Sequence, residues 1–115
     1  MKLKILLAAL ILSSNTAFAA HTCGGKITTV DIGSNGALHI TVDTIGVGNL
    51  VCSISRKVGT IEVDTCKALH SMVLAASMAN KNVTLWFNKD DNKDCRKGEW
   101  IDLQDHGFYF LRISS

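Results

Sequence analysis

The stretch from Asp64 to Asn88 constrains the fold of this chain most, because it joins an amphipathic helix to a short apolar strand. No glycine or proline interrupts the chain between Asp64 and Gly98. Asp64 and Thr65 can accept hydrogen bonds from the free N–H groups of a first turn, so we expect a helix to begin there. Apolar residues then recur at spacings of three and four and predict one stripe that faces a core: Cys66, Leu69, Val73 and Ala76.

A second apolar strip on the same helix consists of Leu74, Ala75 and Met78. A helix that is apolar on two sides is either wedged deep in its own domain or in contact with another subunit, and both interpretations remain open at this point. We therefore treat these three residues as candidates for an oligomer contact.

The segment from Val83 to Phe87 follows a polar helix end and predicts a strand. Its alternation places Val83, Leu85 and Phe87 on one face, and Thr84 and Trp86 on the other. One face of this strand should therefore pack on the core, and Trp86 should point away from it.

Residues 1–19 have the features of a secretory signal peptide. Lys2 and Lys4 give a positive start, the run from Ile5 to Leu12 is apolar, and Ala17 and Ala19 supply the small residues that a signal peptidase reads. The apolar run is too short to span a bilayer, which needs about 20 residues. We expect one secreted or periplasmic domain at residues 20–115, with no membrane span.

The charge of the mature chain excludes one class of partner. Of the twelve lysines and arginines, two lie in the signal peptide, so ten basic residues face ten acidic ones after cleavage. A neutral domain has no electrostatic footprint for nucleic acid, and an exported protein seldom meets any.

Four cysteines, Cys23, Cys52, Cys66 and Cys95, predict two disulfides in an exported chain. Their spacing does not fit a zinc site. Of the three possible pairings we favour Cys52–Cys66, which joins a strand to the start of the helix, and Cys23–Cys95, which ties the N-terminal segment to a long loop.

The remaining strands follow from alternation and turn residues. Strands are predicted at 26–32, 38–42, 50–55 and 107–114. In the first of them, Thr28, Val30 and Ile32 share one face, and a turn marked by Gly46, Gly48 and Asn49 precedes the strand at 50–55. In the last strand, one face carries Phe108 and Phe110, and the other carries Tyr109, Leu111 and Ile113. Trp100, Ile101 and Leu103 are expected to fold back under the domain. The order strand, strand, strand, helix, strand, strand is that of a five-stranded Greek-key barrel, the OB-fold, with a plain α+β sandwich as the alternative.

Part of the chain resembles a known family. Cys52 is followed by thirteen residues, Cys66, an alanine-rich helix and the segment from Asn80 to Phe87. Over about residues 50–88 this arrangement resembles the OB-fold B subunits of bacterial A-B toxins, nearest to those of subtilase cytotoxin and the pertussis-type toxins. The resemblance implies an exported domain that binds cell-surface glycans as a ring, such as a pentamer, with the helices lining its centre. It leaves two forms open, a B subunit with a catalytic A subunit as its partner and a relative without a catalytic partner. No sugar-binding residue carries over.

Independently of the resemblance, a sugar site needs aromatic rings beside amides or carboxylates. Trp86 is the first candidate, because it is out of phase with its core-facing neighbours; Trp100, Asp102 and Tyr109 follow. For each of them, burial in the core or at a subunit contact is the competing explanation.

The sequence favours neither a metal site nor catalysis. Asp90, Asn92 and Asp94 suggest calcium, but the sixth and twelfth positions of such a loop are here Cys95 and Ile101, which do not suit it. The histidines at 39, 70 and 106 have no serine or free cysteine at a recognisable spacing. We expect no cofactor and no enzyme activity. The alternative to a glycan-binding module is a monomeric periplasmic or secreted protein that binds another protein, as an inhibitor or assembly factor.

Overall fold

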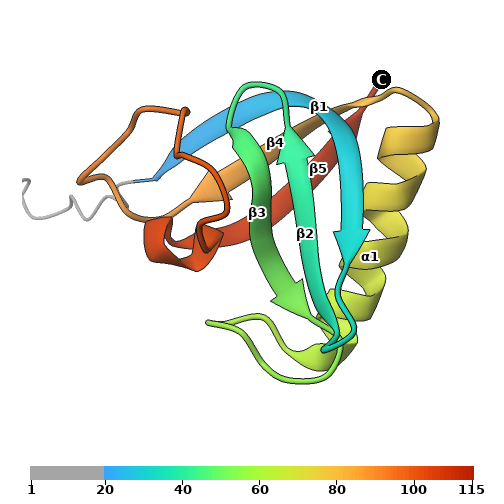
Figure 1. Ribbon diagram of the computed structural model, residues 1–115. Helices are drawn as coiled ribbons and strands as arrows, with labels where there is room; N and C mark the ends of the chain where they lie inside the picture. Colours follow the sequence, from blue (N-terminus) through green and yellow to red (C-terminus); the bar gives the residue numbers. More distant parts are fainter. Residues whose placement is uncertain (1–19) are drawn as a thin grey trace, which may run out of the picture.

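The computed structural model describes residues 20–115, and the predicted signal peptide at 1–19 lies outside them. The elements along the chain are β1 (His21–Ile32), β2 (Ala37–Val42), β3 (Gly46–Ser53), α1 (Val63–Met78), β4 (Asn82–Phe87), the 3-10 helix η2 (Leu103–His106) and β5 (Phe108–Ser114) (Figure 1). The structure is therefore mainly β with one α-helix. Within residues 20–115, no helix is long and apolar enough to cross a membrane.

The five strands form one antiparallel sheet in the order β3-β2-β1-β4-β5. The long strand β1 belongs to two halves of this sheet, because its first half pairs with β4 and its second half pairs with β2. The pairing with β2 shifts register between Ile27 and Thr29, and β1 curves strongly along its length (Figure 1). The sheet is thus wrapped around a core on its concave side.

The sheet is not closed into the barrel that the order of elements predicts. Strands β3 and β5 are its two edges. The chain at 97–102 lies along β3 instead, where Trp100 N donates to Val47 O at 2.8 Å and Leu50 N donates to Ile101 O at 2.9 Å. Helix η2 then contacts both β3 and β5. These segments occupy the place that a β3–β5 ladder would need.

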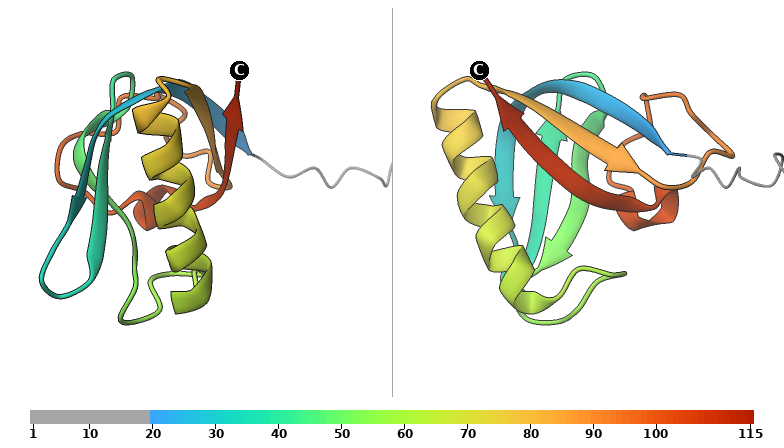
Figure 2. Two further views of the ribbon diagram at one scale, coloured as in Figure 1. Left: turned by 90° about the vertical axis from the view of Figure 1, so that its right-hand side faces the viewer. Right: turned by 180° about the vertical axis from the view of Figure 1, so that it is seen from behind.

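Helix α1 packs on β1 and β3 and lies along one side of the curved sheet (Figure 2). The predicted stripe is confirmed, since Cys66, Leu69, Val73 and Ala76 are the buried residues of the helix. The predicted core face of β4 is confirmed as well, since Val83, Leu85 and Phe87 are fully buried.

The predicted start of the helix at Asp64 and Thr65 is wrong by one or two residues. The helix begins at Val63, after Glu62, whose side chain makes no capping hydrogen bond. Asp64 lies inside the first turn, where a negative charge favours the positive end of the helix dipole. The helix ends before Asn80, which adopts a left-handed φ of 55°. Asparagine tolerates that conformation better than most residues do.

The predicted turn at Gly46 and Gly48 is also wrong, because both glycines lie within β3. Gly48 has a left-handed φ of 64°, and a side chain there would overlap the Trp100 ring. A side chain at Gly46 would overlap the backbone of Gly98. These glycines therefore permit the close approach of residues 97–102 and do not mark a turn.

Two disulfides join Cys23 to Cys95 and Cys52 to Cys66, which is the pairing favoured from the sequence. Cys52 and Cys66 are fully buried between β3 and α1, and Cys23 is almost fully buried on β1. The longer bridge anchors the loop between β4 and η2 to the first strand. Two disulfides fit a protein that folds in an oxidising compartment.

Candidate functional site: exposed aromatic residues and an apolar groove

Trp100 is the most exposed large aromatic side chain among residues 20–115, with 63% of its surface accessible. The expectation that it folds under the domain is wrong. Its backbone has a left-handed φ of 56°, which is uncommon for a bulky residue. Such a conformation persists only where the surroundings fix it, and it is found most often at binding and active sites.

The surroundings of Trp100 hold it from three sides. Its N–H donates to Val47 O on β3, and the next N–H, that of Ile101, donates to Asn49 Oδ1 at 3.1 Å. Its ring lies against the bare backbone of Gly48. The His39 ring lies 5.7 Å away between centroids, and His39 Nδ1 is 2.8 Å from Gly48 O, so that nitrogen donates. The indole is therefore presented to solvent on a rigid support.

Asp102, two residues further on, has a structural role. Its carboxylate accepts a hydrogen bond from Gln104 N at 2.8 Å and caps η2. One carboxylate oxygen is thus already engaged, and the side chain is half-buried.

The other two predicted residues lie on β4 and β5. Trp86 is half-buried, pairs across the strands with Phe110, and meets its ring edge-on at 4.9 Å. The Arg112 guanidinium lies 4.9 Å over the Trp86 ring. Tyr109 is 45% exposed, and its ring lies 6.4 Å from that of Phe110. The four residues predicted to bind a ligand therefore fall into two groups, one beside β3 and one on the paired strands β4 and β5.

An apolar groove lies between α1 and β5 and encloses a cavity of about 200 Å³. Ala68 and Met72 line it from the helix, and Tyr109 and Phe110 line it from the strand. Met72 and Phe110 were not predicted as site residues, because neither breaks the local pattern of its own segment. The groove exists only because the fold places these two segments side by side.

The second apolar strip of α1 is exposed. Leu74 is 40% and Met78 is 85% accessible, and Ala75 is exposed as well. The interpretation in which α1 is wedged deep in its own domain is therefore wrong. The sheet covers only the side of the helix that carries the buried stripe.

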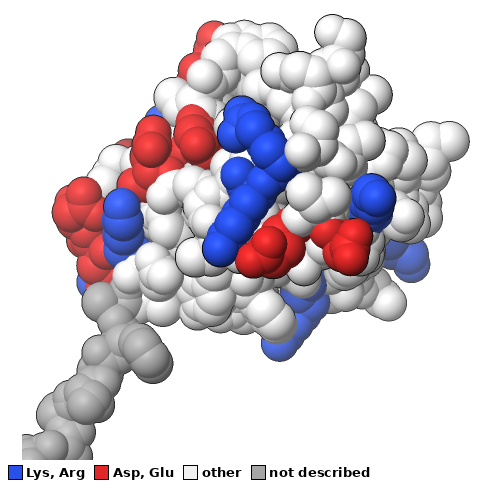
Figure 3. Space-filling model, turned by 90° about the horizontal axis from the view of Figure 1, so that it is seen from below, with Lys and Arg blue, Asp and Glu red and all other residues white. Residues whose placement is uncertain are grey.

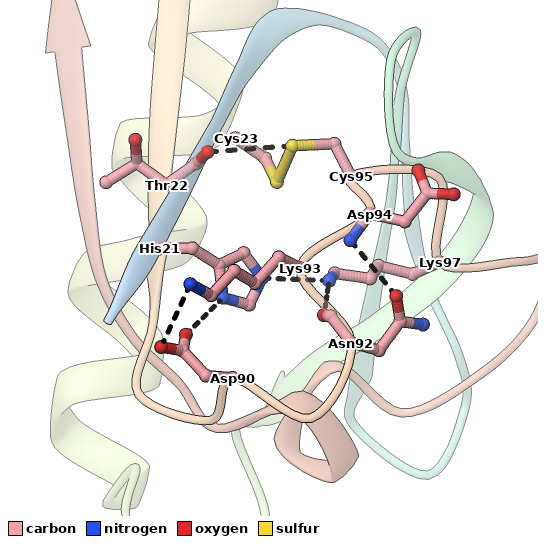
Figure 4. Close-up of polar contacts among 9 residues, drawn as sticks. All are labelled: His21, Thr22, Cys23, Asp90, Asn92, Lys93, Asp94, Cys95 and Lys97. Atoms are coloured by element: carbon pink, nitrogen blue, oxygen red, sulfur yellow. Dashed lines mark hydrogen bonds and ion pairs between the residues drawn. A yellow bond between two sulfur atoms is a disulfide. The ribbon is translucent and has the colours of Figure 1, made fainter. Parts of the chain in front are cut away.

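A polar cluster lies beside the buried ring of Phe87. Figure 4 shows the contacts of His21 and Lys97 within this cluster. Lys97 Nζ lies 2.9 Å from His21 Nε2 and 5.0 Å from the Phe87 centroid, and it donates to Asn92 O. His21 Nδ1 lies 3.3 Å from Asp90 Oδ1. Burial lowers the pKa of Lys97, against the opposing charges of Asp94 and Asp91.

The His106 ring meets the Phe87 ring edge-on, with 6.5 Å between the two centroids. Burial lowers the pKa of His106, and the charge of Lys97 lowers it further. The pKa of this group is therefore lower in the folded protein than its ordinary value of 6.5. His106 therefore takes up a proton more readily in the unfolded chain than in the folded protein. Protonation of His106 destabilises the fold as the pH drops below 6.5.

On the face drawn in Figure 3, basic and acidic side chains lie among one another, and a large part of the face carries no charged side chain. Residues 20–115 contain ten basic and ten acidic side chains, which agrees with this mixture. The chain has no match among models of known protein families, and it has none among curated proteins.

Proposed function

We propose that the chain is an exported recognition module of OB-like architecture that binds glycans and acts without catalysis. The order of its elements and the curved five-stranded sheet support a Greek-key arrangement in which residues 97–106 replace the closing ladder. The two disulfides support folding outside the reducing cytoplasm. A toxin-like B subunit is the form of this proposal that the partial resemblance over residues 50–88 favours.

The observation that carries the proposal is the exposed and conformationally fixed ring of Trp100. A sugar ring has an apolar face that stacks on an indole, and its hydroxyls then need nearby polar partners. Our candidates for such partners are His39, whose ring lies 5.7 Å from that of Trp100, and the second carboxylate oxygen of Asp102, two residues along the chain. A rigid aromatic ring loses little conformational freedom on binding, which favours affinity.

Replacing Trp100 with alanine should weaken glycan binding about tenfold or more, since exposed aromatic anchors dominate many binding energies. The measurement is a glycan array with the oxidised protein, displayed at multivalent density, followed by titration of the best ligand. Phe110→Ala is the matched control, because it removes an exposed aromatic ring from the other group. Absence of binding above background for the unaltered protein would count against the proposal, and equal losses in both variants would count against Trp100 as the anchor.

We further propose that copies associate through the exposed strip of α1. Met78→Glu places a charge in a strip that a subunit contact would desolvate, so the variant should shift from an oligomer, such as a pentamer, to a monomer. Native mass spectrometry at physiological salt measures this directly. Lys67→Glu changes an exposed residue on the same helix and serves as the control. A monomeric unaltered protein would contradict the ring.

A second candidate function is the binding of another protein, and the groove between α1 and β5 favours it. An extended peptide can add a strand to a free sheet edge while its side chains enter an adjacent apolar groove. Strand β5 is such an edge, and Met72 and Phe110 line the groove beside it. A monomer in the mass measurement, together with a periplasmic partner recovered by pull-down, would bring this candidate to first place.

A further inference from the structure

The contact between Lys97 and His21 fixes the protonation state of the histidine. The ammonium of Lys97 has only hydrogens to donate, so His21 Nε2, at 2.9 Å, must be the acceptor. The ring proton then resides on Nδ1, which donates to Asp90 Oδ1 at 3.3 Å. The arrangement in Figure 4 therefore requires a neutral His21.

A second proton on His21 would disrupt this arrangement. It would sit on Nε2, remove the acceptor of Lys97 and place two cations at hydrogen-bonding distance. Lys97 has little room to withdraw into water, since only 9% of its surface is accessible. His106 adds a third group that becomes cationic in acid, and it faces the same Phe87 ring.

The carboxylates near the cluster do not offset the repulsion between a protonated His21 and the Lys97 ammonium. Asp90 contacts His21, but Lys93 Nζ also lies 3.6 Å from its other oxygen. Asp91 and Asp94 are exposed and act on Lys97 from the solvent side. Asp105 is exposed as well and acts on His106. Solvent weakens the attraction of these three exposed groups.

Few other contacts hold this part of the loop to the rest of the domain. Lys97 N donates to Ile45 O at 2.9 Å, and the Cys23–Cys95 disulfide joins the loop covalently to β1. The disulfide retains the segment if the polar contacts are lost, but it leaves the residues on either side free to move.

We propose that residues 90–97 form an acid-sensitive clasp, in which protonation of His21 expels Lys97 and releases the segment from β1 while the disulfide keeps it tethered. The clasp precedes Trp100 by three residues. If Trp100 binds the ligand, as proposed above, release in acid also loosens the ligand site. The clasp itself operates in the free protein.

Amide hydrogen exchange of the oxidised protein without ligand tests the clasp, at about pH 7.5 and about pH 5, corrected for intrinsic exchange rates. The Lys97 amide is the reporter, because it is bonded to Ile45 O. Its protection should fall about tenfold or more in acid, while that of Leu85 in β4 should stay within about twofold. Constant protection at Lys97, or an equal loss at Leu85, would overturn the proposal.

Two variants assign the effect to named groups. His21→Gln keeps an acceptor in the position of Nε2 but cannot titrate, and Lys97→Met keeps the buried stem but removes the cation. Both should abolish the loss of protection in acid. His106→Asn should retain it. If the loss persists in either of the first two variants, or disappears only in the third, His21 is not the switch. Because the readout needs no ligand, a failure of glycan binding leaves this test unaffected.

Discussion

Replacing Phe87 with alanine is expected to lower the free energy of unfolding by about 4 kcal/mol, the usual scale for removing a large buried aromatic side chain. Phe87 is fully buried, and its ring is the surface on which His21, His106 and Lys97 are arranged. The variant leaves a cavity and removes the aromatic face beneath a buried ammonium. Since small domains are stable by only about 5 to 15 kcal/mol, a large part of the protein's stability would be lost.

Urea denaturation followed by far-UV circular dichroism measures this effect. Phe110→Ala is the matched control, because Phe110 lies on the adjacent strand and is 47% exposed. We expect the control to lose about 1 kcal/mol or less, as exposed positions usually do. Similar losses in the two variants would contradict the assignment of Phe87 to the core.

Removing the Cys23–Cys95 disulfide by a double alanine substitution is expected to cost about 4 kcal/mol. The two residues are separated by 72 positions in sequence, so the bridge strongly restricts the unfolded chain. The bridge between Cys52 and Cys66 spans 14 positions, for which the same chain-entropy estimate is about 3 kcal/mol.

The same denaturation experiment, applied to the double-alanine variant and to the unaltered protein, measures the contribution of the Cys23–Cys95 bridge. The unaltered protein in the presence and absence of reductant gives the contribution of both bridges together. A loss below about 1 kcal/mol for the Cys23 and Cys95 pair would show that the entropic account fails for this bridge. A change in the exchange of residues 90–97 at neutral pH would accompany the loss, because the loop would then be held by its polar contacts alone.

Residues whose environment depends on local periodicity were predicted well. The helix stripe through Leu69 and Val73 and the buried face of β4 follow from spacing alone, because each element packs one continuous face on the core. Strand β2 behaves in the same way, with Leu38, Ile40 and Val42 all buried.

Bulges explain where the same reasoning failed. In β5 the register shifts beside Phe87, which pairs with Phe108, while Trp86 pairs with Phe110. Tyr109 is the extra residue, so Phe108 is buried while Phe110 is exposed, although strict alternation predicts one face for both. The shift after Ile27 makes Thr28 the extra residue in β1, so the buried Ile27 and the half-buried Val30 both pack on the core although they are three positions apart.

The candidate sites were the least predictable features, because they depend on contacts between distant segments. Trp100 is followed closely by Ile101 and Leu103, which predicted a buried segment. Its exposure results from the chain at 97–102 lying along β3. The groove joins Met72 of the helix to Phe110 of the last strand. The clasp joins His21 to Lys97, which are 76 positions apart. Periodicity contains no information about such pairs.

The covering of β3 by residues 97–102 limits how copies of this protein can assemble. Three backbone hydrogen bonds, from Lys97 to Ile45, from Trp100 to Val47 and from Leu50 to Ile101, occupy that edge, so β5 is the edge left open in the sheet of residues 20–115. A sheet with one open edge can be extended once, by a second copy of the same edge, and then has none left. Growth into fibrils by edge pairing therefore stops at two chains. A ring of five must join unlike surfaces, so pairing of one β5 edge with another cannot build it.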